Sequence, residues 1–316
     1  MELTVDCVLT PELSNLPFNS ALAQLLSKGL VSHIEAPLEA LICEQFGQQS
    51  TPDFPIAAIC AGADGLEVDD AYWLRADPVH LVLQRDCFSL HEAVPLPIDA
   101  AHAKTMVASL NQHFNQDGLM FLIGNSGAWY LRTDKNLDIK TSLPSVVAGK
   151  NIHQFMPQGL AASKWLAVLN EVQMLLFEHP ANVARESLGQ PAVNSIWLSG
   201  GGKMPQTLPL SSKVDLVLGD SIFYQALAKC TGAPCQELPI NLSNVLNQQA
   251  QQVRLQLPNT NTLAWFEHLL IALKTKKITQ LTMNLGFYEK SLMITIKPID
   301  TYKFWRGNKP VMDYLQ

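Results

Sequence analysis

The chain has 316 residues, 47% of them hydrophobic and 16% charged, and its formal net charge is −6. This length suffices for two domains or for one large domain with an insertion. The acidic balance argues against a general nucleic-acid binder, and the absence of any run of eighteen apolar residues argues against a membrane-spanning helix. The six cysteines lie mostly in apolar stretches and form no C-x-x-C pair, so we expect reduced thiols and a cytoplasmic protein.

The N-terminal part predicts alternating strands and helices. Apolar residues alternate with polar ones over residues 3–9, which indicates a strand. Helices are expected over residues 20–28 and 37–46, because Gly29 and Gly47 follow them as terminating residues. The apolar run at residues 56–61 predicts a buried strand.

The middle of the chain predicts a separate lobe. Asp99 is expected to open an amphipathic helix that ends at Gly118. Two strands, at residues 119–123 and 128–132, flank Asn125-Ser126-Gly127 and predict a hairpin. We therefore predict an inserted α+β lobe over residues 86–158, within a core domain that is formed by residues 1–85 and 159–316.

The C-terminal half resumes the alternation. We expect the helices and strands to follow one another as a helix from residue 162 to about 179, strands at 195–198 and 214–218, helices at 221–230 and 262–274, and an antiparallel hairpin of strands 278–285 and 291–297 at a sheet edge. This rhythm predicts the α/β class, with a mostly parallel sheet and helices on its faces.

The segment from His179 to Lys203 holds the strongest local signal. A short apolar run there leads into Gly200-Gly201-Gly202-Lys203. Three glycines allow the backbone N–H groups to point at an anion, and Lys203 would add positive charge. The spacing is not that of a P-loop, because Met204 stands where a hydroxyl is required. A tight turn or a close-packing site explains the glycines equally well.

The same segment carries a family resemblance. The run from Pro157 through the long helix to HPANVARESLGQPAVNSIWLSGGGKMP resembles the archaeal type of cofactor-independent phosphoglycerate mutase. That family has an HP-x-N-x-x-R segment, a G-x-P-x-N strand and a W-x-x-G-x-G loop in the same order. The likeness spans most of residues 15–235, and its specific part is confined to about 179–205. It is closer still to a proteobacterial branch of the family, labelled phosphoglycerate-mutase-related or as a regulator of pathogenicity factors.

The resemblance implies an alkaline-phosphatase-like fold in which Asp and His side chains hold two divalent metals and a serine attacks. It places the first metal-binding segment near Asp6 and Thr10-Pro11, where the glycines and further aspartates of the family are missing. The last segment would fall near residues 283–290, which read MNLGFYEK without histidine or aspartate. Two adjacent hard cations need several carboxylates and imidazoles, so we expect the mutase site to be lost.

Two groups of residues remain as candidates for a site. Asp77 and His80 are the pair most suggestive of metal or acid–base work, but in an extended segment they point to opposite faces, which favours capping and packing. Asn182, Arg185 and Asn194 match the family motif. Arg185 could grip a phosphate or carboxylate that Asn194 and the glycines orient, whereas Asn182 could instead cap a helix.

Two functions follow as hypotheses. The first is a degenerate, regulatory relative of the phosphoglycerate mutases, without a cofactor, that binds a small phosphorylated or carboxylated metabolite or a protein partner. The second is an active mutase or phosphohydrolase that uses manganese or another divalent metal in a rearranged site. That site would be built from Asp6, Ser14, Asp77 and His80. Neither hypothesis involves a nucleic acid or a membrane.

Overall fold

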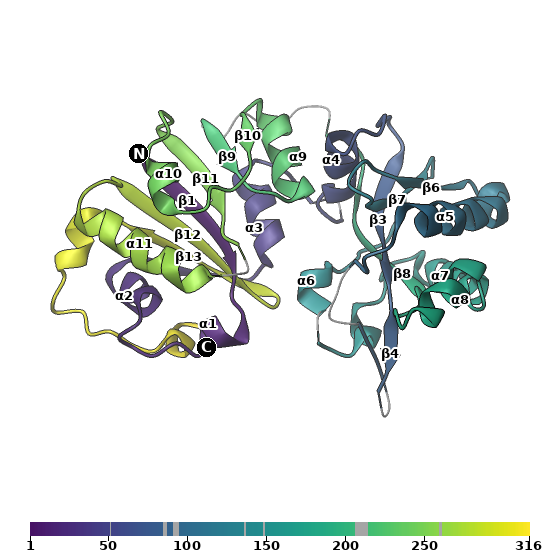
Figure 1. The fold of residues 1–316 in the computed structure, drawn as a ribbon, viewed down its shortest axis with the longest axis horizontal. Coiled ribbons are helices and arrows are strands. Elements are labelled where there is room, and N and C mark those ends of the chain that lie inside the picture. The colour runs from purple at the N-terminus through teal and green to yellow at the C-terminus, as the bar shows by residue number, and fades with distance from the viewer. Residues whose placement is uncertain are drawn as a thin grey trace. The chain divides into compact units, whose positions relative to one another are not determined.

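The structure of the protein is a computed structural model, which describes residues 1–50, 52–84, 87–90, 95–135, 137–147, 149–205, 214–258 and 261–316 (Figure 1). It divides into two compact units, one of residues 1–47 and 208–316 and the other of residues 48–207. These boundaries differ from the predicted ones at 85/86 and 158/159. The reason is that strands β3 (Tyr72–Val79) and β8 (Ser195–Gly202) pair with each other in the sheet of the second unit.

The first unit is built on a seven-stranded sheet. Its strands lie in the order β10 (Cys235–Gln236), β9 (Leu216–Leu218), β11 (Gln252–Gln256), β1 (Glu2–Val8), β12 (Gln280–Phe287), β13 (Lys290–Ile296) and β2 (Leu30–Ile34). The strands from β10 to β12 are parallel, and β13 is antiparallel to both β12 and β2. The predicted hairpin of β12 and β13 is confirmed, but it is not at the edge, because β2 covers it.

Helices lie on both faces of this sheet. They are α1 (Pro11–Ser14), α2 (Ala21–Lys28), α3 (Leu38–Gln45), α9 (Ile222–Thr231), α10 (Leu242–Leu246) and α11 (Thr262–Lys274), with 3₁₀ turns η3 (Pro298–Tyr302) and η4 (Val311–Tyr314). Leu3 and Val5 of β1 belong to the apolar core that includes residues of α2 and α11. Asp6, which points to the opposite face, contacts Tyr224 of α9.

The second unit is built on a four-stranded antiparallel sheet in the order β6 (Leu119–Ile123), β7 (Trp129–Thr133), β3 and β8, beside a small hairpin of β4 (Leu81–Leu83) and β5 (Phe88–Leu90). Its helices are α4 (Ile56–Ala63), α5 (Ala100–Phe114), α6 (Pro144–Val147), α7 (Ala162–Leu176) and α8 (Pro180–Ser187), with 3₁₀ turns η1 (Asn115–Asp117) and η2 (Ile152–Phe155). The helix capped by Asp99 and the hairpin of β6 and β7 are confirmed.

One predicted element of this region has the wrong type, and one predicted strand is confirmed but lies in a different sheet. The apolar run at residues 56–61 is helix α4, whose residues Ile56 to Ala61 are all buried. A helix that is buried on every side has apolar residues at all positions, so its sequence cannot be distinguished from that of a buried strand. The strand predicted at residues 195–198 extends to Gly202 and is antiparallel to β3, whereas the βαβ rhythm had assigned it to the parallel sheet.

No helix within the described ranges is long and apolar enough to cross a membrane.

Candidate functional site

A buried polar cluster lies in the first unit, where the resemblance places the metal-binding residues. Asp6 of β1 and Asn284 of β12 are partners in the strand register, and both are almost fully buried. The Nε and Nη2 atoms of Arg254, on β11, donate to the two carboxylate oxygens of Asp6 at 2.6 and 2.9 Å. Asn284 Nδ2 and the Tyr224 hydroxyl donate to the same carboxylate at 2.7 and 2.8 Å. Four donor contacts therefore surround one buried carboxylate.

Gln45 of α3 closes the cluster from the helix layer. Its Oε1 accepts hydrogen bonds from Arg254 Nη2 at 2.9 Å and from Asn284 Nδ2 at 3.0 Å. Its Nε2 donates to Asn284 Oδ1 at 3.0 Å. The Arg254 guanidinium also lies over the ring of Phe46, 4.9 Å from its centroid. Burial and the charge of Asp6 raise the pKa of Tyr224 well above its ordinary value, so the phenol stays protonated and remains a donor.

This cluster does not fit a pair of divalent metals. Asp6 is its one carboxylate, and the guanidinium of Arg254 already balances that charge. Asn284 and Gln45 use their amide groups on each other and on the ion pair. Over the described ranges of the chain, no group of three or more His, Cys, Asp or Glu side chains is arranged to hold a metal ion. A cation is present in this cluster, but it belongs to the chain itself.

The sequence indicated Asp6 and the segment around Asn284 as parts of this site, but it did not indicate Arg254, Gln45 or Tyr224. Only Arg254 carried a usable signal. It stands between Val253 and Leu255 in a short strand, and a charged residue there has to find a partner if the strand is central. The partner could not be named, because strand order brings β11 beside β1 from far along the chain.

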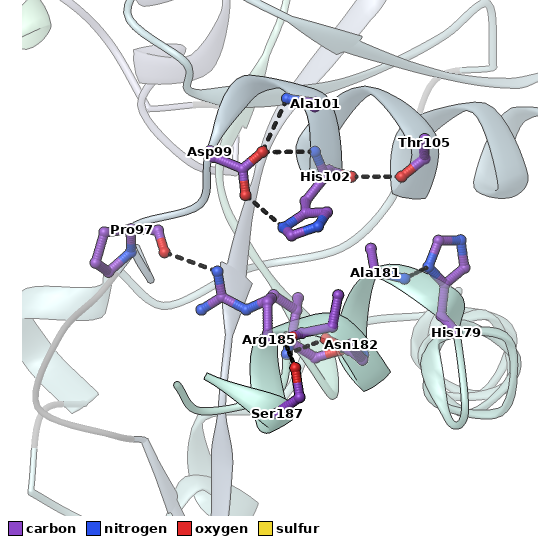
Figure 2. Close-up of polar contacts among 12 residues, drawn as sticks. Pro97, Asp99, Ala101, His102, Thr105, His179, Ala181, Asn182, Arg185 and Ser187 are labelled. Atoms are coloured by element: carbon purple, nitrogen blue, oxygen red, sulfur yellow. Dashed lines mark hydrogen bonds and ion pairs between the residues drawn. The ribbon is translucent and has the colours of Figure 1, made fainter. Parts of the chain in front are cut away.

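Asn182 lies in helix α8 of the second unit (Figure 2), and among the described residues its side chain hydrogen-bonds to main-chain groups. Its amide nitrogen donates to the carbonyls of Leu176 and Val193 at 2.8 and 2.9 Å, and its oxygen accepts from the Val193 N–H at 2.8 Å. It does not cap helix α8. His179 holds that position, and its Nδ1 accepts from the N–H of Ala181 at 3.2 Å. Asn182 therefore links the end of α7 to the chain that enters β8.

Arg185 is 2% exposed and also binds main-chain carbonyls (Figure 2). Its Nε and Nη2 donate to the carbonyl of Pro191 at 3.1 and 3.0 Å, and its Nη1 donates to that of Pro97 at 3.1 Å. Burial lowers the pKa of Arg185, while the nearby Asp99 opposes this shift. The guanidinium stays charged, because the unperturbed pKa of arginine lies far above neutrality. In this arrangement it joins α8 to two neighbouring segments.

Asn194 behaves like an added residue of a strand ladder. Its side-chain oxygen accepts from the Leu81 N–H at 2.7 Å, and its side-chain nitrogen donates to the Leu81 carbonyl at 2.9 Å. Its own N–H donates to the carbonyl of Val79 at 3.1 Å. The side chain therefore continues the pairing between β3 and β8 beyond their ends.

The three glycines are buried at the end of strand β8. A Cβ atom at Gly200 would lie 2.9 Å from the Ile56 Cβ, and one at Gly202 would lie 2.8 Å from the Pro55 Cβ. Gly200 has a φ of +63°, which favours glycine. These distances accord with close packing between β8 and the start of α4.

An internal carboxylate faces the glycine stretch. The main chain of Gly201 lies near enough to the Asp53 carboxylate to favour its charged form, and Asp53 accepts from the Thr141 N–H at 2.9 Å and from the Thr141 hydroxyl. Burial raises the pKa of Asp53, and these hydrogen bonds oppose the rise. Lys203, directly after the glycines, is exposed. Asp53 thus stands where an external anion was expected.

Asp77, His80 and Ser14 each have a separate local partner. Asp77 is buried and pairs with Arg75 of the same strand, whose Nε lies 3.1 Å from the carboxylate. His80 Nδ1 lies 2.7 Å from the carbonyl oxygen of Ala192. The Ser14 hydroxyl donates to the Thr10 carbonyl at 3.0 Å. Asp77 and His80 therefore have no partner in common among these contacts.

The sequence is similar to part of two curated enzymes, while no family model matches it. Over 138 residues it is 26% identical to the 2,3-bisphosphoglycerate-independent phosphoglycerate mutase of Methanosarcina barkeri (strain Fusaro / DSM 804), covering 40% of this chain and 35% of that protein. Over 183 residues it is 25% identical to the probable 2,3-bisphosphoglycerate-independent phosphoglycerate mutase of Geobacter sulfurreducens, covering 56% of this chain and 45% of that protein. The chain thus spans less than half the length of either relative.

A solved structure shares the fold. The PH0037 protein from Pyrococcus horikoshii matches with a TM-score of 0.51 and 12% sequence identity, over 94% of this chain and 87% of that one. At this identity the likeness concerns the fold alone. Together with the sheet order of the first unit, it confirms the predicted α/β class with a mostly parallel sheet.

Proposed function

Because this chain is related in part to the 2,3-bisphosphoglycerate-independent phosphoglycerate mutases, we propose that it is a metal-free relative that acts by binding and not by phosphoryl transfer. The observation that carries the proposal is the pairing of Asp6 with Arg254. The carboxylate that the resemblance assigns to a metal is occupied by a guanidinium. Without a bound cation the chain has no metal clamp for a transferring phosphoryl group, and such a clamp is a main part of this chemistry.

Metal binding at this position would require a large rearrangement. Arg254 is 3% exposed, and it would have to leave both Asp6 and Gln45. Breaking a buried ion pair by removing one partner costs about 3–5 kcal/mol, because the other charge stays buried without compensation. The entering ion would gain a single carboxylate, which is far less than two adjacent hard cations need.

The binding role extends the sequence-based hypothesis. A cytoplasmic regulatory function, through a metabolite or a protein partner, accords with the loss of the metal ligands. If the ligand is a phosphorylated or carboxylated metabolite held by residues 182–203, Arg185 must exchange its internal acceptors for it. The exposed Lys203 is the cation of that segment that can meet an anion without such an exchange.

The test is a coupled assay for the interconversion of 3- and 2-phosphoglycerate. Chelator-treated protein is assayed with and without manganese, beside the phosphoglycerate mutase of Methanosarcina barkeri as a positive control. We expect no turnover in either state. Manganese is also expected to leave the melting temperature unchanged, because an ion that binds only the folded state would raise it.

The rival hypothesis predicts the opposite result. Manganese-dependent turnover that is lost in Asp77→Asn or His80→Gln, but kept in the exposed control Asp134→Asn, would show an enzyme with relocated ligands. That outcome would overturn the binding role proposed here. The melting temperature of each variant is measured in parallel, so that loss of activity is not confused with loss of fold.

A further inference from the structure

We propose that a cavity within the second unit binds an uncharged, mainly apolar small molecule. The cavity has a volume of about 510 Å³. Small-molecule sites commonly have this size and a mostly apolar lining with a few polar groups. The inference does not rest on the proposed function, because the metal argument concerns only the first unit.

Helix α7 forms one wall of the cavity with a distinct face. Leu166, Leu169, Asn170 and Gln173 line it and follow one another at the spacing i, i+3, i+4 and i+7, which is one side of a helix. The stripe of Trp165, Val168, Val172 and Leu176 packs into the apolar core of this unit, and Leu169 belongs to both this core and the lining. The same helix thus stabilises the core with one face and leaves a second face for the cavity.

Strand β8 and the hairpin of β4 and β5 supply other parts of the lining. The indole of Trp197 is held in place, because its Nε1 donates to the Ser142 carbonyl at 2.8 Å. A fixed aromatic ring offers a large apolar contact area at little entropic cost. Phe88 and Leu166, also in the lining, are 47% and 37% exposed. An apolar ligand would remove these side chains from water.

The chemistry of the lining selects against a charged ligand. No Asp, Glu, Lys or Arg is among the described residues that line the cavity. A charge buried there would lose its hydration without gaining a partner of opposite sign. Its polar residues are Asn170 and Gln173 of α7, Ser195 of β8, and Cys87, Asn151 and His153. The Ser195 hydroxyl has only a 3.4 Å contact with the Ile196 carbonyl, so it can turn to a ligand.

The test uses two fluorescent probes that share one ring system. N-phenyl-1-naphthylamine is uncharged, and 8-anilino-1-naphthalenesulfonate adds a sulfonate. We expect the uncharged probe to bind at one site per chain and the sulfonate to bind at least about tenfold more weakly, because the described lining holds no lysine or arginine to balance the sulfonate. Absence of saturable binding of the uncharged probe, or equal binding of both probes, would overturn the proposal.

Substitutions on α7 locate the bound probe. Gln173→Glu places a charge in the lining and is expected to weaken binding of the uncharged probe at least about tenfold. Gln173→Leu is expected to retain binding. Met174→Glu is the control, because Met174 is the next residue, is 77% exposed and is not in the lining. Equal effects of the two glutamate variants, with both folded by circular dichroism, would refute a site in this cavity.

Discussion

At the scale of single residues, Asp6 and Arg254 form an ion pair whose two side chains are 0% and 4% exposed. The pair is surrounded by Asn284, Gln45 and Tyr224, so each charge has further hydrogen-bond partners. A buried pair of this kind stabilises little against an apolar replacement of both partners. Loss of one partner, however, leaves the other charge without compensation.

Arg254→Met is therefore expected to lower the free energy of unfolding by about 3–5 kcal/mol, measured by urea denaturation. Arg132→Gln serves as the matched control. Its pair with Asp69 is more exposed, and such pairs contribute about 1 kcal/mol or less. Combining Arg254→Met with Asp6→Asn should recover part of the loss, because no unpaired charge then remains. A loss no larger than that of the control would contradict this account of the cluster.

His179 makes the stability of the second unit depend on pH. Burial lowers the pKa of His179, and the nearby His102 lowers it further. Its Nδ1 accepts from the Ala181 N–H, so the neutral ring carries its proton on Nε2, 3.1 Å from the Ser109 hydroxyl oxygen. Protonation would add a second proton at Nδ1, and the unfolded chain binds this second proton more tightly than the folded one, so His179 contributes stability above about pH 6.5 that is lost as the pH falls.

In the variant His179→Asn, the free energy of unfolding is expected to depend less on pH below about pH 6.5. Asparagine also caps helices well, so the cap on α8 is kept while the titrating group is removed. The measurement is the free energy of unfolding of both proteins between pH 5 and pH 8. We expect the difference between them to change with pH below about 6.5 and to be constant above it. A constant difference throughout would exclude a contribution from His179.

At the scale of elements, α4 and β8 are packed so closely that glycine is required on one side. Gly202 of β8 faces Pro55 at the start of α4, where a Cβ atom would lie 2.8 Å from the Pro55 Cβ. Gly62, within α4, differs in this respect. A Cβ atom there would meet Val68 and Met204 at 3.6 and 3.7 Å, which are ordinary contact distances.

Two alanine substitutions should therefore change the free energy of unfolding in opposite directions. Gly202→Ala is expected to destabilise the protein by about 1–3 kcal/mol, because neither backbone can move away easily. Gly62→Ala is expected to stabilise it by about 0.5–1 kcal/mol, since alanine restricts the unfolded chain and fits a helix. Urea denaturation of the two variants measures both effects. Stabilisation by Gly202→Ala would contradict the close packing of β8 against the start of α4.

At the scale of the whole molecule, the second unit is continuous in sequence and the first is not. Residues 48–207 contain their own four-stranded sheet and an apolar core of large side chains, including Phe114, Trp129 and Trp165. The first unit needs strands from both ends of the chain, because β1 lies between β11 and β12.

Residues 48–207, produced alone, are accordingly expected to fold. The expected result is a single cooperative transition in urea, seen equally by circular dichroism and tryptophan fluorescence. A fragment without a cooperative transition would show that the second unit depends on the first. The uncharged naphthylamine probe can then be tested on the folded fragment, since the proposed cavity lies entirely within it.

Much of the local structure could be predicted because short-range hydrogen bonds and turns produce it. Ser20 caps α2 by accepting from the Ala23 N–H, and Asp99 caps α5 in the same way. The hairpin of β6 and β7 follows its Asn-Ser-Gly turn. In contrast, α4 was mistaken for a strand, because complete burial removes the periodicity on which such predictions depend.

The sequence by itself determined that this is an α/β protein and indicated Asp6 and residues 283–290 as the segments that the resemblance assigns to metal binding, because residue types can be read without coordinates. Only the tertiary structure decided which side chains surround Asp6. The cluster takes Asp6, Gln45, Tyr224, Arg254 and Asn284 from five elements, and strand order and helix packing bring them together. It likewise decided that Asp53 faces the glycine stretch and that one side of α7 lines a cavity. These contacts join residues far apart in the chain, and no local pattern contains that information.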